Sequence, residues 1–263
     1  MTKEERQLLD EKYGGQKTPG FEEDGKRLQA GEPLAYIIGW QPFLGLKIYL
    51  DNRPLIPRPE TEWWVEKLMG EAGAIFSATG CSKAEPEPEG AKKSLRRPAL
   101  LDLCAGSGTI GCVALKMLSN TIVYFGEIDP AHKSTIEKNI RENGLDESRA
   151  DIRIGDLFEP FKGLIFDIIA VNPPYIPSHR ALPESISRYE PAKALYAGED
   201  GLDLIRRIAK DLPNYLAKGG QAWIECDSEH AEAAGDLFKS TGMQAKIHTD
   251  LYGRPRLLVI SFP

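Results

Sequence analysis

From residue 99 onward, the sequence alternates between short apolar runs and segments whose apolar residues recur at helical spacing. The apolar runs are ALLDLC, TIVYFGEI, DIRI, LIFDIIAV and QAWIEC, and the other segments predict helices at 109–118, 131–143, 201–216 and 229–240. Strands that alternate with helices form parallel sheets covered on both faces. The order therefore predicts an α/β fold with a doubly wound, mostly parallel, Rossmann-like sheet of about seven strands, closed by QAKIHT and RLLVISF as an antiparallel end pair.

The residues before this alternation predict a smaller N-terminal segment. Helices are expected at 2–13 and 22–30, and YIIGWQPFLGLKIYL predicts two short strands joined by a turn. We therefore divide the chain into residues 1–60, a short helical segment with a β-hairpin that could dock the substrate, and residues 61–263, the main domain.

The stretch LIPRPETEWWVEKLMGEAG joins the two parts. Its Pro-Arg-Pro unit must be extended, because proline restricts both itself and the residue before it. Thr61 can cap a following helix, whose apolar residues Trp64, Val65, Leu68 and Met69 fall at helical spacing. Residues 77–98, SATGCSKAEPEPEGAKKSLRRP, are small, charged and rich in proline, so they predict a disordered insertion.

The composition excludes several classes of protein. A formal net charge of −6 argues against unspecific attraction to nucleic acid. The same net charge is still compatible with a local basic face on the surface. The four cysteines and four histidines are scattered without a CxxC or HExxH pattern, so no metal site is expected and a reducing compartment fits. No apolar run has membrane-spanning length, and the N-terminus lacks a secretory signal. We expect a soluble cytoplasmic protein with no membrane partner; a mitochondrial location is the alternative, although no presequence is visible.

The loop DLCAGSGTIG joins the first strand of the alternation to the first helix. Gly106 and Gly108 permit a tight turn there and let a ligand approach the backbone. A glycine-rich turn also occurs in plain α/β proteins, but Glu127 ends the next strand about 20 residues later, where a carboxylate can accept hydrogen bonds from both ribose hydroxyls. The pattern indicates a nucleoside-containing cofactor.

Asp102 favours S-adenosylmethionine over a nicotinamide cofactor. Asp102 ends the strand just before the glycine loop, a poor position beside a pyrophosphate but a suitable one near the ammonium of a methionine moiety. It could also cap the backbone amides of the loop itself, and the two roles are compatible. Asp156, in GDLF, could meet an adenine amino group or simply cap the next segment.

The strand LIFDIIAV ends in the tetrapeptide Asn172-Pro173-Pro174-Tyr175. It could be a rigid strand-terminating turn with Tyr175 packed on the core. Its position at the carboxyl edge of the sheet, where open α/β folds bind ligands, favours a chemical role. The Asn172 side-chain oxygen and the Pro173 carbonyl can each accept one N–H bond from a planar NH2 group, and Tyr175 can stack on that group. Held in this way, the nitrogen can direct its lone pair at a sulfonium methyl without a strong general base.

These motifs give the chain a resemblance to release factor glutamine methyltransferases of the HemK/PrmC type. The resemblance runs from about residue 31 to the C-terminus and rests on GEPLAYIIGWQPFLG, LIPRPETE, DLCAGSGTIG, GEIDP, VNPPYIP, EPAKALYAGEDGLDLI and DLYGRPR. NPPY alone is shared with adenine and cytosine amino methyltransferases, whereas LIPRPETE with the EP…AL…DGL segment is more specific. The resemblance implies a methyltransferase fold and transfer of a methyl group from S-adenosylmethionine to the glutamine amide in a Gly-Gly-Gln loop of a peptide-chain release factor.

The resemblance also implies roles for individual residues. Asn172 and Pro173 would hold the substrate amide as catalytic residues, with Tyr175 in contact with it and Pro174 beside it. Around the substrate entrance it adds Arg58 and Glu60. The implied cofactor contacts are Gly106, Gly108, Glu127 and Asp156, to which we add Asp102 and Asn172.

The chain departs from the family pattern at four places, one of which is the insertion at 77–98. Cys104 replaces the usual first glycine of the loop, Glu127 stands where aspartate is commoner, and the N-terminal helical part is shorter than usual. Two other readings stay open at this point: an adenine amino methyltransferase acting on DNA or RNA, and a catalytically silent binding protein. The acidic balance and the lack of an added recognition domain count against direct nucleic-acid binding, and the sequence predicts no oligomeric state.

Overall fold

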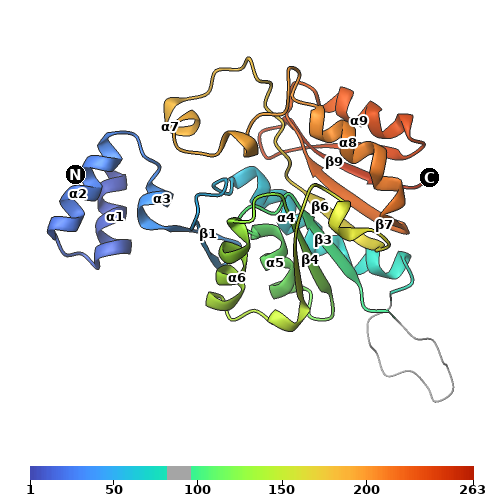
Figure 1. Ribbon diagram of the computed structural model, residues 1–263, viewed down its shortest axis with the longest axis horizontal. Helices are drawn as coiled ribbons and strands as arrows, with labels where there is room; N and C mark the ends of the chain where they lie inside the picture. The colour runs from blue at the N-terminus through green and yellow to red at the C-terminus, as the bar shows by residue number, and fades with distance from the viewer. Residues whose placement is uncertain (82–95) are drawn as a thin grey trace.

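The computed structural model describes residues 1–81 and 96–263, and within them seven strands form one twisted sheet (Figure 1). The strands are β3 (Ala99–Leu103), β4 (Ile122–Glu127), β5 (Ala150–Ile154), β6 (Phe166–Val171), β7 (Leu216–Glu225), β8 (Gln244–Thr249) and β9 (Pro255–Ser261). Their order is β5-β4-β3-β6-β7-β9-β8, with β9 antiparallel to β7 and β8 and the other pairs parallel. The predicted doubly wound sheet and its antiparallel end pair are confirmed.

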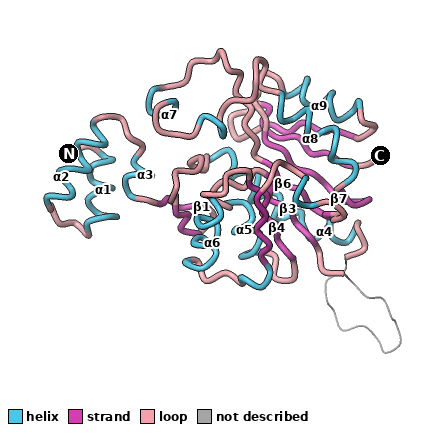
Figure 2. Tube along the Cα trace, viewed as in Figure 1, coloured by secondary structure: helices cyan, strands magenta, loops and turns pink. Residues whose placement is uncertain are grey.

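Helices cover both faces of the sheet (Figure 2). On one face lie α4 (Pro59–Ala78), α5 (Thr109–Met117) and α6 (His132–Glu142), and on the other α8 (Asp203–Asp211) and α9 (Ala231–Ser240). Because side chains alternate along a strand, Leu100 and Ile168 join the first core whereas Leu101 and Ile169 join the second. In the described part of the chain, no helix is long and apolar enough to span a membrane.

Three short helices precede the sheet and lie at one end of the molecule (Figure 1). They are α1 (Lys3–Tyr13), α2 (Pro19–Gln29) and α3 (Leu34–Ile38). Thr2 and Glu5 form a capping box at the start of α1, which matches the helix predicted at 2–13. The second helix begins earlier than predicted, because Thr18 caps it and Pro19 occupies its first position. The prediction missed α3, whose sequence LAYII has the β-branched and aromatic character of a strand.

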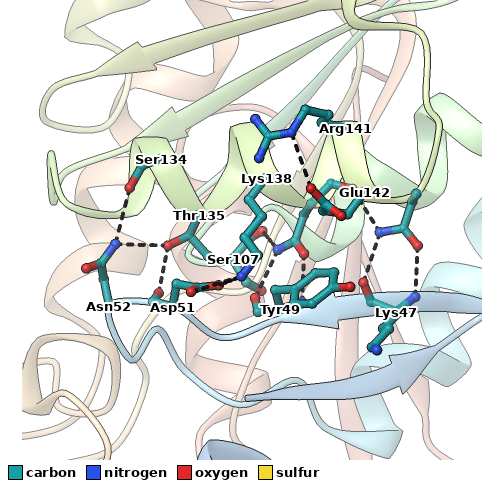
Figure 3. A network of polar contacts seen from close by, with 12 residues as sticks. Lys47, Tyr49, Asp51, Asn52, Ser107, Ser134, Thr135, Lys138, Arg141 and Glu142 are labelled. Carbon is teal, nitrogen blue, oxygen red and sulfur yellow. Dashed lines mark hydrogen bonds and ion pairs between the residues drawn. The ribbon is translucent and has the colours of Figure 1, made fainter.

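A β-hairpin of β1 (Trp40–Phe43) and β2 (Leu46–Tyr49) connects these helices to the main domain. Asn139 of α6 and Asn143, the residue at its C-cap, pair with the outer edge of β2 in the manner of a neighbouring strand; Figure 3 labels their partners Tyr49 and Lys47. The Tyr49 N–H donates to Asn139 Oδ1 at 2.7 Å, and Asn139 Nδ2 donates to the Tyr49 carbonyl at 3.0 Å. Asn143 makes the same two bonds with Lys47, both at 2.9 Å. These amides satisfy the edge of the hairpin and fix it against the main domain.

Several boundaries around the main domain differ from the predictions. Helix α4 starts at Pro59, with Arg58 at its N-cap position, so Thr61 lies inside the first turn and does not cap it. The predicted insertion at 77–98 is too wide, because Ser77 and Ala78 still belong to α4 and Cys81 is buried. At the other end of that range, Arg96 forms an ion pair of 2.5 Å with the buried Asp167, and residues 82–95 lie outside the described residues.

The helix predicted at 201–216 is also shorter in the structure. Helix α8 ends at Asp211, and a 3-10 turn with Pro213 follows at Leu212–Asn214, since proline cannot donate the backbone bond that would continue the helix. Strand β7 consequently starts at Leu216, before the predicted run QAWIEC.

The Asn139 pairing predicts an unequal cost for two similar substitutions. Asn139→Ala removes the two bonds to Tyr49 and a third to the Ser107 carbonyl, all inside the protein, so it should lower the free energy of unfolding by about 2–3 kcal/mol. Asn143→Ala acts at a more exposed pair and should cost about 1 kcal/mol or less. Urea unfolding of both variants checks this, and equal losses would contradict it.

Candidate active site

The register of the parallel strands gathers their carboxyl ends. Leu103 of β3 pairs with Gly126 of β4 and with Val171 of β6, and Val171 pairs with Ile224 of β7. The residues that follow these partners leave the sheet side by side, and Asn172 is among them. Strand order reverses between β3 and β6, so this edge is the switch point at which open α/β sheets bind ligands.

A cavity of about 300 Å³, here called the larger cavity, opens at this edge. Its lining includes residues from the glycine loop, from the ends of β4, β5 and β6 and from α8: Gly106, Glu127, Asp129, Asp156, Asn172, Pro174 and Arg207. The structure thus brings together predicted site residues that are far apart in the sequence.

Glu127 is the most constrained carboxylate of the larger cavity. Its side chain is buried; Oε2 accepts the Gly106 N–H at 2.7 Å and Oε1 accepts the Asp129 N–H at 2.9 Å. Burial opposes ionisation, but His132, 3.4 Å away, and the two backbone donors lower the pKa of Glu127 overall. The carboxylate is therefore ionised, fixed and able to accept further hydrogen bonds from a ligand.

The glycines of the loop have different tasks. Gly106 lines the larger cavity with a φ of 56°. Gly108, the N-cap of α5, is absent from that lining, and a Cβ there would come within 3.0 Å of the Ile136 side chain. Cys104 has a φ of 62°, a left-handed conformation that a glycine adopts without strain. The chain therefore departs from the family pattern at a position where the backbone still has the glycine conformation.

The structure separates the two other predicted cofactor residues, Asp102 and Asp156. Asp102 is fully buried, accepts the Gly111 N–H at 2.8 Å and is not part of the cavity lining, so the capping role is the one observed. Burial raises the pKa of Asp102 well above its usual value. Asp156 does line the larger cavity and forms an ion pair of 2.7 Å with Arg207.

A smaller cavity of about 130 Å³ meets the larger one at Leu55, Asn172 and Ala194. Its other lining residues include three of the predicted substrate residues: Arg58, Pro173 and Tyr175. Glu60 lines neither cavity. Successive residues of a helix point about 100° apart, and here the next one, Thr61, is buried against the end of β7.

Arg58 holds one wall of the smaller cavity. Its guanidinium donates to Glu190 Oε1 at 2.5 Å, and Glu190 Oε2 accepts the Ile56 N–H at 3.2 Å. Glu190 is buried and lies 132 residues from Arg58, so this pair ties the segment before α4 to the segment after α7 (Glu184–Ser187).

Sequence reasoning missed a buried carboxylate at the end of β7. Glu225 Oε2 accepts hydrogen bonds from the Thr61 hydroxyl at 2.7 Å and the Trp64 indole at 2.8 Å, and Oε1 accepts the Tyr175 hydroxyl at 2.9 Å. Asn172 Nδ2 donates to Thr61 Oγ1 at 3.2 Å. The signal that could have found Glu225 is its place at a strand end, on the same edge as Asn172.

The Asn172 side-chain oxygen is the open group of this cluster. It is buried, and none of the residues that the structure describes donates a hydrogen bond to it. A buried acceptor without a partner costs free energy unless a ligand supplies a donor. Asn172 lines both cavities, so this unpartnered acceptor belongs to a residue at their junction.

Comparison with known proteins decides the family. Residues 91–188 match the sequence profile described as methyltransferase small domain. A protein of Lactococcus lactis named release factor glutamine methyltransferase is 31% identical over 261 residues, which cover 96% of this chain and 86% of that protein. A protein of the same name from Thermodesulfovibrio yellowstonii is 34% identical over 236 residues, covering 87% and 76%. The chain belongs to the release factor glutamine methyltransferase family.

Membership in the release factor glutamine methyltransferase family confirms the resemblance seen in LIPRPETE and NPPY. The fold also agrees with solved methyltransferases. The hMettl16 catalytic domain, solved in complex with an RNA hairpin of the MAT2A 3′UTR, superposes with a TM-score of 0.56 at 17% identity, over 83% of this chain and 75% of that one. At this identity the likeness concerns the fold alone.

Glu127 generates a binding prediction. Glu127→Ala should weaken S-adenosylmethionine binding by about 1–3 kcal/mol, because it removes the ionised acceptor predicted to hold the ribose hydroxyls. Glu137→Ala, which changes an exposed carboxylate of α6, is the matched control and should leave the affinity unchanged. Titration calorimetry measures both; an unchanged affinity for Glu127→Ala would remove Glu127 from the cofactor site.

Proposed function

We propose that this protein transfers a methyl group from S-adenosylmethionine to the side-chain amide nitrogen of the glutamine in the Gly-Gly-Gln loop of a peptide-chain release factor. The observation that carries the proposal is the unpartnered, buried oxygen of Asn172 at the junction of the two cavities. The names of the relatives support the choice of acceptor.

The larger cavity presents the acceptors that the cofactor needs. When bound, S-adenosylmethionine supplies an electrophilic methyl group on a positively charged sulfur. In the lining, Asp129 pairs with Lys193 at 3.1 Å and Asp156 with Arg207 at 2.7 Å, and Glu127 lies 3.4 Å from His132. In this proposal Glu127 accepts the ribose hydroxyls, Gly106 leaves room beside the backbone, and Asp156 meets the adenine amino group.

The smaller cavity fits a glutamine side chain. Leu55, Ile176 and Ile186 give it apolar walls for the two methylene groups. Asn172 stands at its junction with the larger cavity, and Pro173, the next residue, lines the smaller cavity. Asn172 Oδ1 and the Pro173 carbonyl each accept one N–H of the acceptor amide. With both protons held, the nitrogen directs its lone pair toward the larger cavity, and these two bonds strengthen as the nitrogen becomes pyramidal and its protons more acidic.

No strong base is needed in this scheme. Among the described residues, no carboxylate or imidazole lines the smaller cavity. A nitrogen-methylated amide sheds its extra proton readily, so water accepts it. Orientation, rather than proton abstraction, is the contribution of the protein to the rate.

The direct test is transfer to a release factor. The purified protein is incubated with methyl-labelled S-adenosylmethionine and a release factor, and in parallel with a release factor whose Gly-Gly-Gln glutamine is replaced by alanine. Label in the Gly-Gly-Gln peptide of the first substrate alone is the expected result. Label that enters an oligonucleotide and not the release factor would overturn the assignment in favour of nucleic-acid methylation.

Asn172→Ala should lower the turnover number about 100-fold or more, because the acceptor amide loses one of its two fixed partners. The affinity for S-adenosylmethionine should stay within a few fold, since the variant keeps Glu127 and the glycine loop. Asn120→Ala, at an exposed position, serves as the control. Steady-state kinetics and calorimetry read the two effects, and a variant that keeps its turnover would exclude the role given to Asn172.

A further inference from the structure

A planar side-chain amide such as that of Asn172 can sit in two orientations that differ by exchange of oxygen and nitrogen. The two groups have nearly the same size, so packing does not distinguish them, and only the hydrogen-bond partners do. The proposed reaction needs the oxygen to face the acceptor. In the reversed orientation, the Asn172 NH2 would meet the NH2 of the substrate, donor against donor.

We propose that Glu225, acting through Thr61, is the positioning residue that holds Asn172 in the productive orientation. The inference rests on the proposed function for its purpose, and on the contacts of Glu225, Thr61 and Asn172 for its geometry.

The orientation follows from counting hydrogens. The Thr61 hydroxyl has one hydrogen, and it goes to Glu225 Oε2 at 2.7 Å. Thr61 Oγ1 can then only accept a further hydrogen bond. The Asn172 group facing it, 3.2 Å away, must be the NH2, and Oδ1 is left for the acceptor.

Burial makes this assignment strict. Glu225 is 1% exposed, Thr61 3% and Trp64 0%, so water cannot replace any of these bonds. The Trp64 indole N–H can only donate a hydrogen bond, and it donates to Glu225 Oε2 at 2.8 Å, the same oxygen that accepts the Thr61 hydroxyl. Burial raises the pKa of Glu225, and the three hydrogen-bond donors and the nearby Arg256 oppose that rise.

Glu225 also holds the other end of the tetrapeptide. Its second oxygen accepts the Tyr175 hydroxyl at 2.9 Å, so one carboxylate fixes the tetrapeptide at Asn172, through Thr61, and at Tyr175 directly. The strand register makes this possible, since Ile224 of β7 pairs with Val171 of β6 and their next residues are Glu225 and Asn172. The Tyr175 ring is thereby anchored by its hydroxyl rather than free to turn toward any ligand.

Three threonine variants test the proposal. Thr61→Val keeps the shape of the side chain and removes the hydroxyl, and we expect the turnover number on the release factor to fall about 100-fold with KM for S-adenosylmethionine unchanged. Thr61→Ser restores the hydroxyl and should recover the turnover number to within about threefold of the original protein. Thr135→Val is the control. It removes an equally buried hydroxyl, which donates to the Asp51 carbonyl at 2.7 Å and makes no contact with Glu225, so turnover should stay unchanged.

A structural readout does not depend on activity. In nitrogen-15 spectra, the side-chain NH2 of Asn172, assigned by its loss in Asn172→Ala, should exchange its protons with solvent about tenfold faster in Thr61→Val than in the original protein. Thr61→Ala provides the same test if the valine variant does not fold. Undiminished turnover in a folded Thr61→Val protein, equal losses in Thr61→Ser, or unchanged exchange at Asn172 would each overturn the proposal.

The two proposals fail in different ways. If the original protein does not methylate the release factor, the proposed function fails, and the exchange measurement still decides whether Thr61 and Glu225 orient Asn172. If methylation occurs but Thr61→Val behaves like Thr135→Val, the proposed function stands and the positioning role is wrong.

Discussion

The parallel register of β4, β3, β6 and β7 is the constraint on which the site depends. It brings the ends of strands that are distant in the sequence to one edge, with Val171 between Leu103 and Ile224. The glycine loop, Glu127, Asn172 and Glu225 follow from that alignment, since each leaves the sheet at the same level. Both faces of the sheet are packed by helices, so a shift of one residue in this register would exchange the two cores as well as disrupt the site.

The chain uses two kinds of group at this edge. Toward the larger cavity it presents a backbone loop and an ionised carboxylate, both held by short hydrogen bonds. Toward the smaller cavity it presents neutral acceptors on a rigid proline turn. In our proposal their orientation is set by Glu225, a carboxylate that lines neither cavity. The separation is physically sensible: a charge beside the acceptor amide would attract water and solvate the nitrogen, whereas a charge behind it can orient the site without contacting the substrate.

The sequence was informative where a pattern is local. The order of strands and helices, the glycine loop with Glu127 and the position of Asn172 after a buried strand could all be predicted, because each depends on neighbours within a few residues or on a known strand order. Thr61 was misjudged because threonine is a good N-cap, while the preceding Pro59 already starts the helix. Glu225 was missed because its partners Thr61 and Trp64 lie 164 and 161 residues away, a distance across which the linear sequence carries no pairing signal. The tie between Asn139 and β2 was missed for the same reason, at a separation of 90 residues.

The central claim is that Asn172 and Pro173 hold the two N–H groups of a substrate amide at the junction of the cavities. A crystal structure of the protein with S-adenosylhomocysteine and a peptide containing Gly-Gly-Gln tests it most directly. The account predicts the glutamine side chain in the smaller cavity, with its amide nitrogen within hydrogen-bond distance of Asn172 Oδ1 and of the Pro173 carbonyl, and with Asn172 Nδ2 still on Thr61. A glutamine bound elsewhere, or an amide that meets Asn172 through its oxygen, would contradict it.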